Sequence, residues 1–230
     1  MISSKTTLVA ALLGAMLFSS VGTAQDLARY RGFFFGMSLE AVAKQINMDP
    51  LAVRTPHQRP AVIQTLQWDQ SRYSVDSPEK DRSLRSIRFD FYNSELSKMV
   101  VTYDPVRTDG LTTNDMIEAI SALYGPAAKP DRTIGVSTSS VFEDKQRVLA
   151  SWENAEYSYN LFRSEYGNTF GLVAFSKRLE LMASLSIAEA ERLDKLEAPD
   201  RERARQLKDT EDKRTAQEKA RLISKPSFRP

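Results

Sequence analysis

The chain of 230 residues contains no cysteine and a single histidine, His57. Without cysteine there is no disulfide, no thiolate nucleophile and no cysteine-ligated zinc or iron–sulfur site. One histidine excludes a histidine-rich metal site. The charges nearly balance, with 32 Lys+Arg against 30 Asp+Glu, whereas nucleic-acid binders usually carry a large basic excess. We therefore expect no nucleic-acid partner and no cofactor.

Long hydrophobic runs are also scarce. The marked run from Leu8 to Phe18 has 11 residues, fewer than the roughly 20 needed to span a bilayer. Residues 1–24 carry one lysine and no acidic residue, and they end in small residues at Ala24, which is the order of a secretory signal peptide. We predict cleavage near Ala24, no membrane span, and a periplasmic or secreted protein. The alternative is an uncleaved N-terminal anchor or a buried helix.

The aromatic residues divide the chain, because 19 of the 21 lie between Tyr30 and Phe175. We predict an α+β globular domain over residues 25–176. A charged helical appendage over 177–222, broken near Pro199, and a disordered tail over 223–230 should follow.

Within the domain, apolar spacing predicts helices at 38–46 and 112–124. Alternating apolar residues over 87–91, the turn sequence Asn93-Ser94-Glu95 and a β-rich stretch over 96–103 predict a β-hairpin. Further strands are expected at 62–68, 134–142, 147–152, 157–162 and 169–175. The stretch 49–60, which contains several prolines, is expected to be irregular.

Short turns between the later strands indicate an antiparallel meander with helices packed on it. The order of helix and then strands occurs twice, with Trp68 in the first set and Trp152 in the second. This favours two α-then-β halves and an internal duplication. The alternative is an ordinary α+β domain that has this order without a repeat.

The heptapeptide Gly36-Met37-Ser38-Leu39-Glu40-Ala41-Val42 leads into the first helix and the meander. In this motif and element order the chain resembles exported modules of the beta-lactamase-inhibitor-protein type and the small outer-membrane-assembly lipoproteins. It is also similar to exported bacterial proteins without an assigned function. The resemblance implies a helical layer on an antiparallel sheet whose open face binds another protein. It implies no particular binding residue, and the lipidated cysteine of the lipoproteins is absent.

The appendage begins with apolar residues at helical spacing from Leu179, although alternation up to Leu185 leaves a strand open. Beyond Pro199, opposite charges stand three or four residues apart, as in Asp209 and Lys213, which favours a solvated single helix. Its apolar stripe is too thin for a coiled coil. The alternative is a helix that binds a partner.

The candidate partner-binding residues are the strand aromatics and the lone aromatic of the tail: Trp68, Trp152, Tyr157, Tyr159 and Phe228. The ordinary alternative is that the strand aromatics form core and that Phe228 is a disordered end.

No sequence motif assigns a catalytic or metal-binding residue. The chain has no nucleophile elbow, no zinc-protease motif and no phosphate-binding glycine loop. The loop over 104–115 holds several oxygen ligands, but turn and helix-cap roles account for them. His57 is expected in a surface loop.

Our leading hypothesis is therefore a non-enzymatic periplasmic module that binds a protein of the cell envelope. The alternatives are an envelope hydrolase that uses acidic residues, or a carrier of a small apolar ligand. The partner and the oligomeric state stay open.

Overall fold

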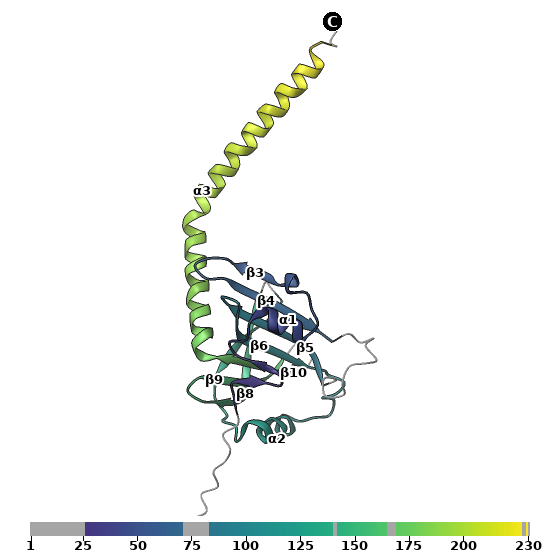
Figure 1. The fold of residues 1–230 in the computed structure, drawn as a ribbon, viewed down its shortest axis with the longest axis vertical. Coiled ribbons are helices and arrows are strands. Elements are labelled where there is room, and N and C mark those ends of the chain that lie inside the picture. Colours follow the sequence, from purple (N-terminus) through teal and green to yellow (C-terminus); the bar gives the residue numbers. More distant parts are fainter. Residues whose placement is uncertain (1–25, 71–82, 140–141, 165–168, 227–228, 230) are drawn as a thin grey trace, which may run out of the picture.

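In the computed structural model, an eight-stranded antiparallel sheet forms the centre of the molecule and helices pack on both of its faces (Figure 1). The structure describes residues 26–70, 83–139, 142–164, 169–226 and 229. The predicted signal peptide lies outside these residues. The predicted fold class is confirmed: an α+β domain with an antiparallel meander and a long C-terminal helix.

Two short strands, β1 (Arg29–Tyr30) and β2 (Phe33–Phe34), form a separate hairpin. The first half continues with α1 (Leu39–Gln45), the 3-10 helix η1 (Pro50–Ala52), β3 (Arg54–His57), β4 (Ile63–Asp69), β5 (Leu84–Tyr92) and β6 (Glu95–Tyr103). The second half has α2 (Thr113–Tyr124), β7 (Thr133–Ser139), β8 (Phe142–Glu153), β9 (Tyr157–Ser164) and β10 (Thr169–Ser176). Helix α3 (Lys177–Ser224) follows directly.

The strand order across the sheet is β3-β4-β5-β6-β10-β9-β8-β7. Each half is thus one helix followed by a four-stranded meander, and the halves meet where β6 pairs with β10. A two-fold rotation about an axis through this seam would place the strands of one half on the corresponding strands of the other half. Trp68 and Trp152 lie on the second strand of their respective meanders. This is the element arrangement that the two-half interpretation requires.

The hairpin of β5 and β6 forms where it was predicted. Its two-residue turn consists of Asn93 and Ser94, which have positive φ of 48° and 67°, the backbone twist that suits a tight hairpin. Phe89 and Phe91 on β5 are buried on one face of the sheet. Pairing with β6 is antiparallel throughout, with register shifts near Leu84 and Phe91.

Helix α2 begins with a capping box. The Thr112 hydroxyl accepts a hydrogen bond from the Asp115 backbone N–H at 3.2 Å, and the Asp115 carboxylate accepts one from the Thr112 N–H at 2.7 Å. Hydrogen bonds from Thr112 hold the pKa of the Asp115 carboxyl below its usual value. The helix ends at Gly125, whose φ of 81° favours glycine.

We expected the stretch over 49–60 to be irregular. This prediction is wrong, because the stretch contains η1 and strand β3. Pro56 lies inside β3, which is possible because β3 is the edge strand and a proline there removes no hydrogen bond of the inner sheet. His57 ends this strand and is half-buried, so it does not lie in a surface loop.

The expected break near Pro199 is also wrong, because α3 is helical throughout its 48 residues with Pro199 inside it. Proline removes one internal hydrogen bond and bends a helix without always ending it. Figure 1 shows that α3 runs beside the body in its first half, changes direction near the middle, and projects away from the body.

The main core lies between one face of the sheet and a layer made of α1, α2 and the β1–β2 hairpin. Val42 of α1 and Leu172 of β10 are fully buried there. The opposite face carries a smaller apolar cluster of Val100, Val136, Phe162 and Val173. Helix α3 packs on this second face, against β5, β6 and β10.

Candidate functional site

The predicted partner-binding aromatics are spread over several environments. Trp152 and Tyr159 lie in the main core, with exposed fractions of 2% and 0%, so their rings are not on a surface that a partner can touch. Trp68 and Tyr157 are half-buried against the same core. The Tyr157 ring stacks on Phe35, with ring centres 5.4 Å apart. Phe228 lies outside the described residues.

Trp152 connects the sheet to helix α2. Its indole N–H lies 3.0 Å from the Gly125 carbonyl oxygen and 3.2 Å from the Ser121 hydroxyl oxygen. The carbonyl at the end of α2 thereby accepts a hydrogen bond, for which the helix itself has no donor. Trp152 is therefore a structural residue of the second half.

The first half of α3 is fixed on the second face of the sheet. Leu179, Ala183 and Ala190 are buried, and Glu180 accepts a hydrogen bond from Lys98 of β6 at 2.6 Å. The Ser176 side chain caps the helix by accepting from the Leu179 N–H. The sheet face that the resemblance expects to be open is thus partly covered by the chain's own helix.

The middle of α3 is held by one arginine that follows β3. The Arg59 guanidinium donates to Glu197 at 2.7 Å and to Asp194 at 3.5 Å. Arg201 donates to the same Asp194 at 2.6 Å. We call these four residues the arginine clamp. Among the described residues, they form the contact between α3 and the domain that lies furthest along the helix.

Beyond the clamp, every described side chain of α3 is exposed. Leu207, Leu222 and Ile223 keep about 70% of their surface open to solvent (72%, 69% and 68%). The charges are interleaved, as in the ion pair of Arg203 with Asp200 at 3.3 Å, and each such pair stabilises a helix by only about 0.2–0.5 kcal/mol. The distal helix is a projecting arm with no support from a core.

We predict that acid releases this arm. The Arg201 hydrogen bond lowers the pKa of Asp194, and the Arg59 hydrogen bond lowers that of Glu197. Folded-state values below the usual 3.8 and 4.5 mean that the clamp is formed above that range and is lost as pH falls through the lowered values. Spin labels at Leu51→Cys and Leu207→Cys should give a narrow distance distribution at pH 7 and a broad one at the acid end of a titration down to pH 2.

Because the chain has no native cysteine, the spin labels attach only to the two introduced cysteines. Arg59→Gln should broaden the distribution already at pH 7. Arg203→Gln is the matched control and should leave it narrow, since Arg203 pairs within the helix. A narrow distribution at both pH values would show that the clamp does not position the arm.

A polar groove of about 770 Å³ lies between the first half of α3 and strands β3–β6. Its carboxylates have partners: Asp90 pairs with Arg88 at 2.9 Å, and Glu180 lies 2.6 Å from Lys98. The Lys98–Glu180 contact fastens α3 to β6, whereas Arg88 and Asp90 pair within β5. Among the described residues, no group of three or more His, Asp or Glu side chains is placed to hold a metal ion.

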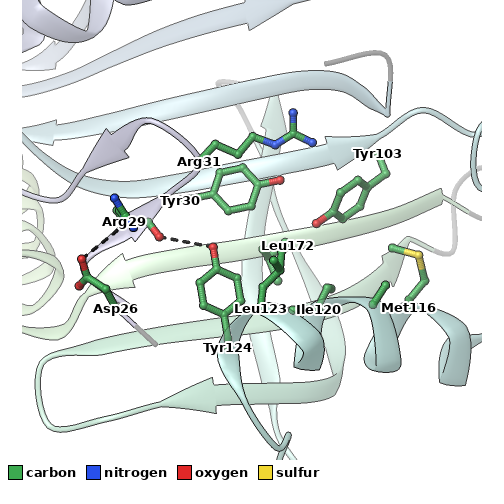
Figure 2. Close-up of a pocket in the computed structure, with 11 residues that line it drawn as sticks. Asp26, Arg29, Tyr30, Arg31, Tyr103, Met116, Ile120, Leu123, Tyr124 and Leu172 are labelled. Carbon is green, nitrogen blue, oxygen red and sulfur yellow. Dashed lines mark hydrogen bonds and ion pairs between the residues drawn. The ribbon is translucent and has the colours of Figure 1, made fainter. Parts of the chain in front are cut away.

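The second hollow, which we call the tyrosine pocket, lies on the main-core side between β1 and α2 and measures about 640 Å³ (Figure 2). Tyr103 of β6 and Leu172 of β10 line it, so its floor is the seam between the two halves. Tyr30 enters from β1 and Tyr124 from the end of α2. The Tyr124 hydroxyl donates to the Arg29 carbonyl oxygen at 3.4 Å.

The phenols of this region stay protonated at neutral pH. Burial is the main cause that raises the pKa of Tyr103 well above its usual value, and the neighbouring Tyr30 adds to it. Burial also raises the pKa of Tyr124 to about 12 and the pKa of Tyr159, which lies behind Tyr124 with ring centres 4.7 Å apart. Neutral phenols donate and accept hydrogen bonds but do not act as bases near pH 7.

No protein-family model, no curated protein and no solved structure matches this chain. The site therefore has to be argued from its own geometry. Within the described residues, no helix is long and apolar enough to cross a membrane.

Two features of the site were not predicted from the sequence. The pocket tyrosines come from three separate elements, and only the fold brings Tyr30, Tyr103 and Tyr124 together. The clamp joins Arg59 to residues more than a hundred positions later, and no local spacing signals that pairing.

Proposed function

We propose that the protein is a non-enzymatic interaction module of the cell envelope whose α+β domain holds out the distal part of α3 to a partner protein. The observation that carries the proposal is the contrast within one helix. Before the clamp, one face of the helix is buried on the sheet through Leu179, Ala183 and Ala190, whereas every described residue after Arg201 is exposed. A long helix without a core of its own is costly to maintain unless something else binds it.

The net charge of the arm indicates which kind of surface a partner would need. From Asp200 to Pro230 the chain has 10 basic and 6 acidic residues, a net charge of 10 − 6 = +4. The exposed leucines between these charges offer apolar contacts along the same arm. We propose a partner with an acidic surface and a shallow apolar groove, a combination in which charge speeds association and apolar contact holds the complex.

The experiment uses a photo-reactive benzophenone attached to Leu207→Cys in the full chain. In envelope extract of producing cells, this probe should form an adduct with one defined protein. The same probe at Leu51→Cys, an exposed leucine of η1 at 87%, should not. Unlabelled full chain should compete for the adduct, and a chain ending after Pro199 should not.

The truncated chain should keep the circular-dichroism melting curve of the domain, because the described residues that it loses are all exposed and, among them, Arg201 bonds only to Asp194 and Glu197 of the same helix. Equal labelling from both probe sites, or equal competition by the truncated chain, would overturn the role of the arm.

A further inference from the structure

We propose that two copies of the chain associate through the outer side of α3, as an antiparallel pair of helices related by a two-fold axis. The contact is made by the part of α3 before Pro199, whose inner side packs on the sheet. Figure 1 shows this part of α3 at the margin of the body. The proposal is independent of the role of the distal arm, because the arm begins beyond this part of the helix.

This part of α3 is apolar on two sides. The side toward the sheet buries Leu179, Ala183 and Ala190, so two of its three buried positions hold the small residue alanine. Larger apolar side chains lie on the other side and keep 38–63% of their surface open to solvent: Leu181, Met182, Leu185 and Leu196. A helix that only covers a sheet needs one apolar face. A second, exposed apolar face is typical of a surface that binds another protein.

The outer side has the residue spacing of a coiled coil. Steps of four, three, four, three and four residues connect its members, which we call the outer stripe: Arg178, Met182, Leu185, Glu189, Arg192 and Leu196. Residues at this spacing form a continuous contact line for a second helix. Beyond Pro199 the same spacing meets the polar residues Arg203 and Gln206, so the stripe ends where the arm begins.

The two charges in the middle of the outer stripe make it complementary to itself in one orientation. In an antiparallel pair whose two-fold axis passes between Glu189 and Arg192, Glu189 of each copy lies opposite Arg192 of the other. Leu185 of each copy then lies opposite Leu196 of the other. A parallel pair would instead set Glu189 against Glu189 and Arg192 against Arg192, and such like-charge contacts are unfavourable.

The present contacts of these two charges leave them available to a second copy. Arg192 donates to Glu189 of the same helix from Nε at 2.8 Å and from Nη2 at 2.7 Å. Among the described residues, its Nη1 group has no acceptor. The two side chains are well exposed, with 58% of Arg192 and 41% of Glu189 open to solvent. Four alternating charges can therefore meet at the axis without breaking the pair inside each helix.

Sedimentation equilibrium of the full chain tests the proposal. From Met182 to Leu196 the stripe spans about 21 Å of helix at about 1.5 Å per residue, and contacts this small give weak complexes. We therefore expect the weight-average mass to rise with concentration from that of one chain toward that of two, with a dissociation constant in the micromolar range.

Leu185→Asp should raise this dissociation constant at least about tenfold, because the dimer loses two leucine contacts and gains two desolvated carboxylates. Leu207→Asp is the matched control, since it makes the same exchange at an exposed leucine of the same helix outside the stripe. Both leucines are more than half exposed, so both variants should fold, which melting curves check. A parent chain that stays monomeric, or a dimer that Leu185→Asp weakens no more than Leu207→Asp does, would overturn the proposal.

Introduced cysteines test the orientation, because the chain has none of its own. Under mild oxidation, a Leu185→Cys chain mixed with a Leu196→Cys chain should form a disulfide-linked dimer. Either variant alone should link far less, since the antiparallel register separates its two cysteines by about 16 Å along the helix, whereas a disulfide needs Cα atoms within about 7 Å. Efficient linking of one variant alone, or a mixture that links no better than the single variants, would overturn the antiparallel arrangement.

Discussion

Trp152→Ala is expected to lower the free energy of unfolding by about 3–5 kcal/mol, the range for truncating a buried large aromatic residue. The side chain is 2% exposed, and its indole N–H serves two acceptors on α2, the Gly125 carbonyl and the Ser121 hydroxyl. Its loss leaves a cavity and removes the donor that ties α2 to β8. Because domains are usually stable by only about 5–15 kcal/mol, the variant should be close to unfolding.

Urea denaturation followed by far-ultraviolet circular dichroism measures this loss. The matched control is Trp68→Ala, the tryptophan on the corresponding strand of the first half, which is only half-buried and should cost clearly less. Trp152→Phe keeps most of the apolar volume and should cost about 1–3 kcal/mol, chiefly through the unserved acceptors. Similar losses for both alanine variants would contradict the assignment of Trp152 as the main link.

The sequence predicted the elements whose signals are local. The β5–β6 hairpin was readable because the turn formers Asn93 and Ser94 stand between two stretches with strand patterns. Helix α2 was readable because its cap, its apolar spacing and its terminal glycine agree. The confirmed fold class follows from such agreement along the chain.

The elements that were missed or misjudged depend on tertiary context. Strand β3 contains Pro56, and proline is compatible with a strand only at the edge of a sheet, a position that local sequence does not reveal. Pro199 was expected to break the appendage, yet α3 passes through it. The paired charges on both sides favour the helix locally, and a bend accommodates the ring.

The sequence predicted which type of residue could form the candidate site, but not where the fold places these residues. Tyr157 and Tyr159 were predicted on a strand, and both lie on its main-core face. Which face the helices would cover depends on how α1, α2 and α3 fold back on the sheet, and β-alternation carries no information on that. The tyrosine pocket exists because β1 and α2 leave a hollow between them on the side of Tyr103 and Leu172, which is a property of the assembled halves.

Next to the seam, one position in a central strand requires glycine. Gly171 on β10 lies directly opposite Phe162 on β9, and the phenylalanine ring lies over it. A Cβ at position 171 would lie 2.6 Å from Cε1 of that ring, well inside contact distance. Phe162 in turn is 3% exposed and belongs to the apolar cluster of the second face.

Gly171→Ala is therefore expected to destabilise the fold by about 1–3 kcal/mol, the usual cost of forcing extra volume into a packed core. Two effects compete, because alanine normally stabilises a strand or helix interior by about 0.5–1 kcal/mol over glycine. Displacing a buried ring outweighs that gain. Urea unfolding of the single variant gives the sign directly.

A double-mutant cycle then assigns the cause. Phe162→Leu removes the ring that covers the glycine and should itself be destabilising, since buried aromatic contacts are lost. In that background Gly171→Ala should cost about 0.5–3 kcal/mol less than it does alone. An alanine that stabilises the parent chain, or costs the same in both backgrounds, would contradict the placement of Phe162 over Gly171 and with it the packing of the second face around β9 and β10.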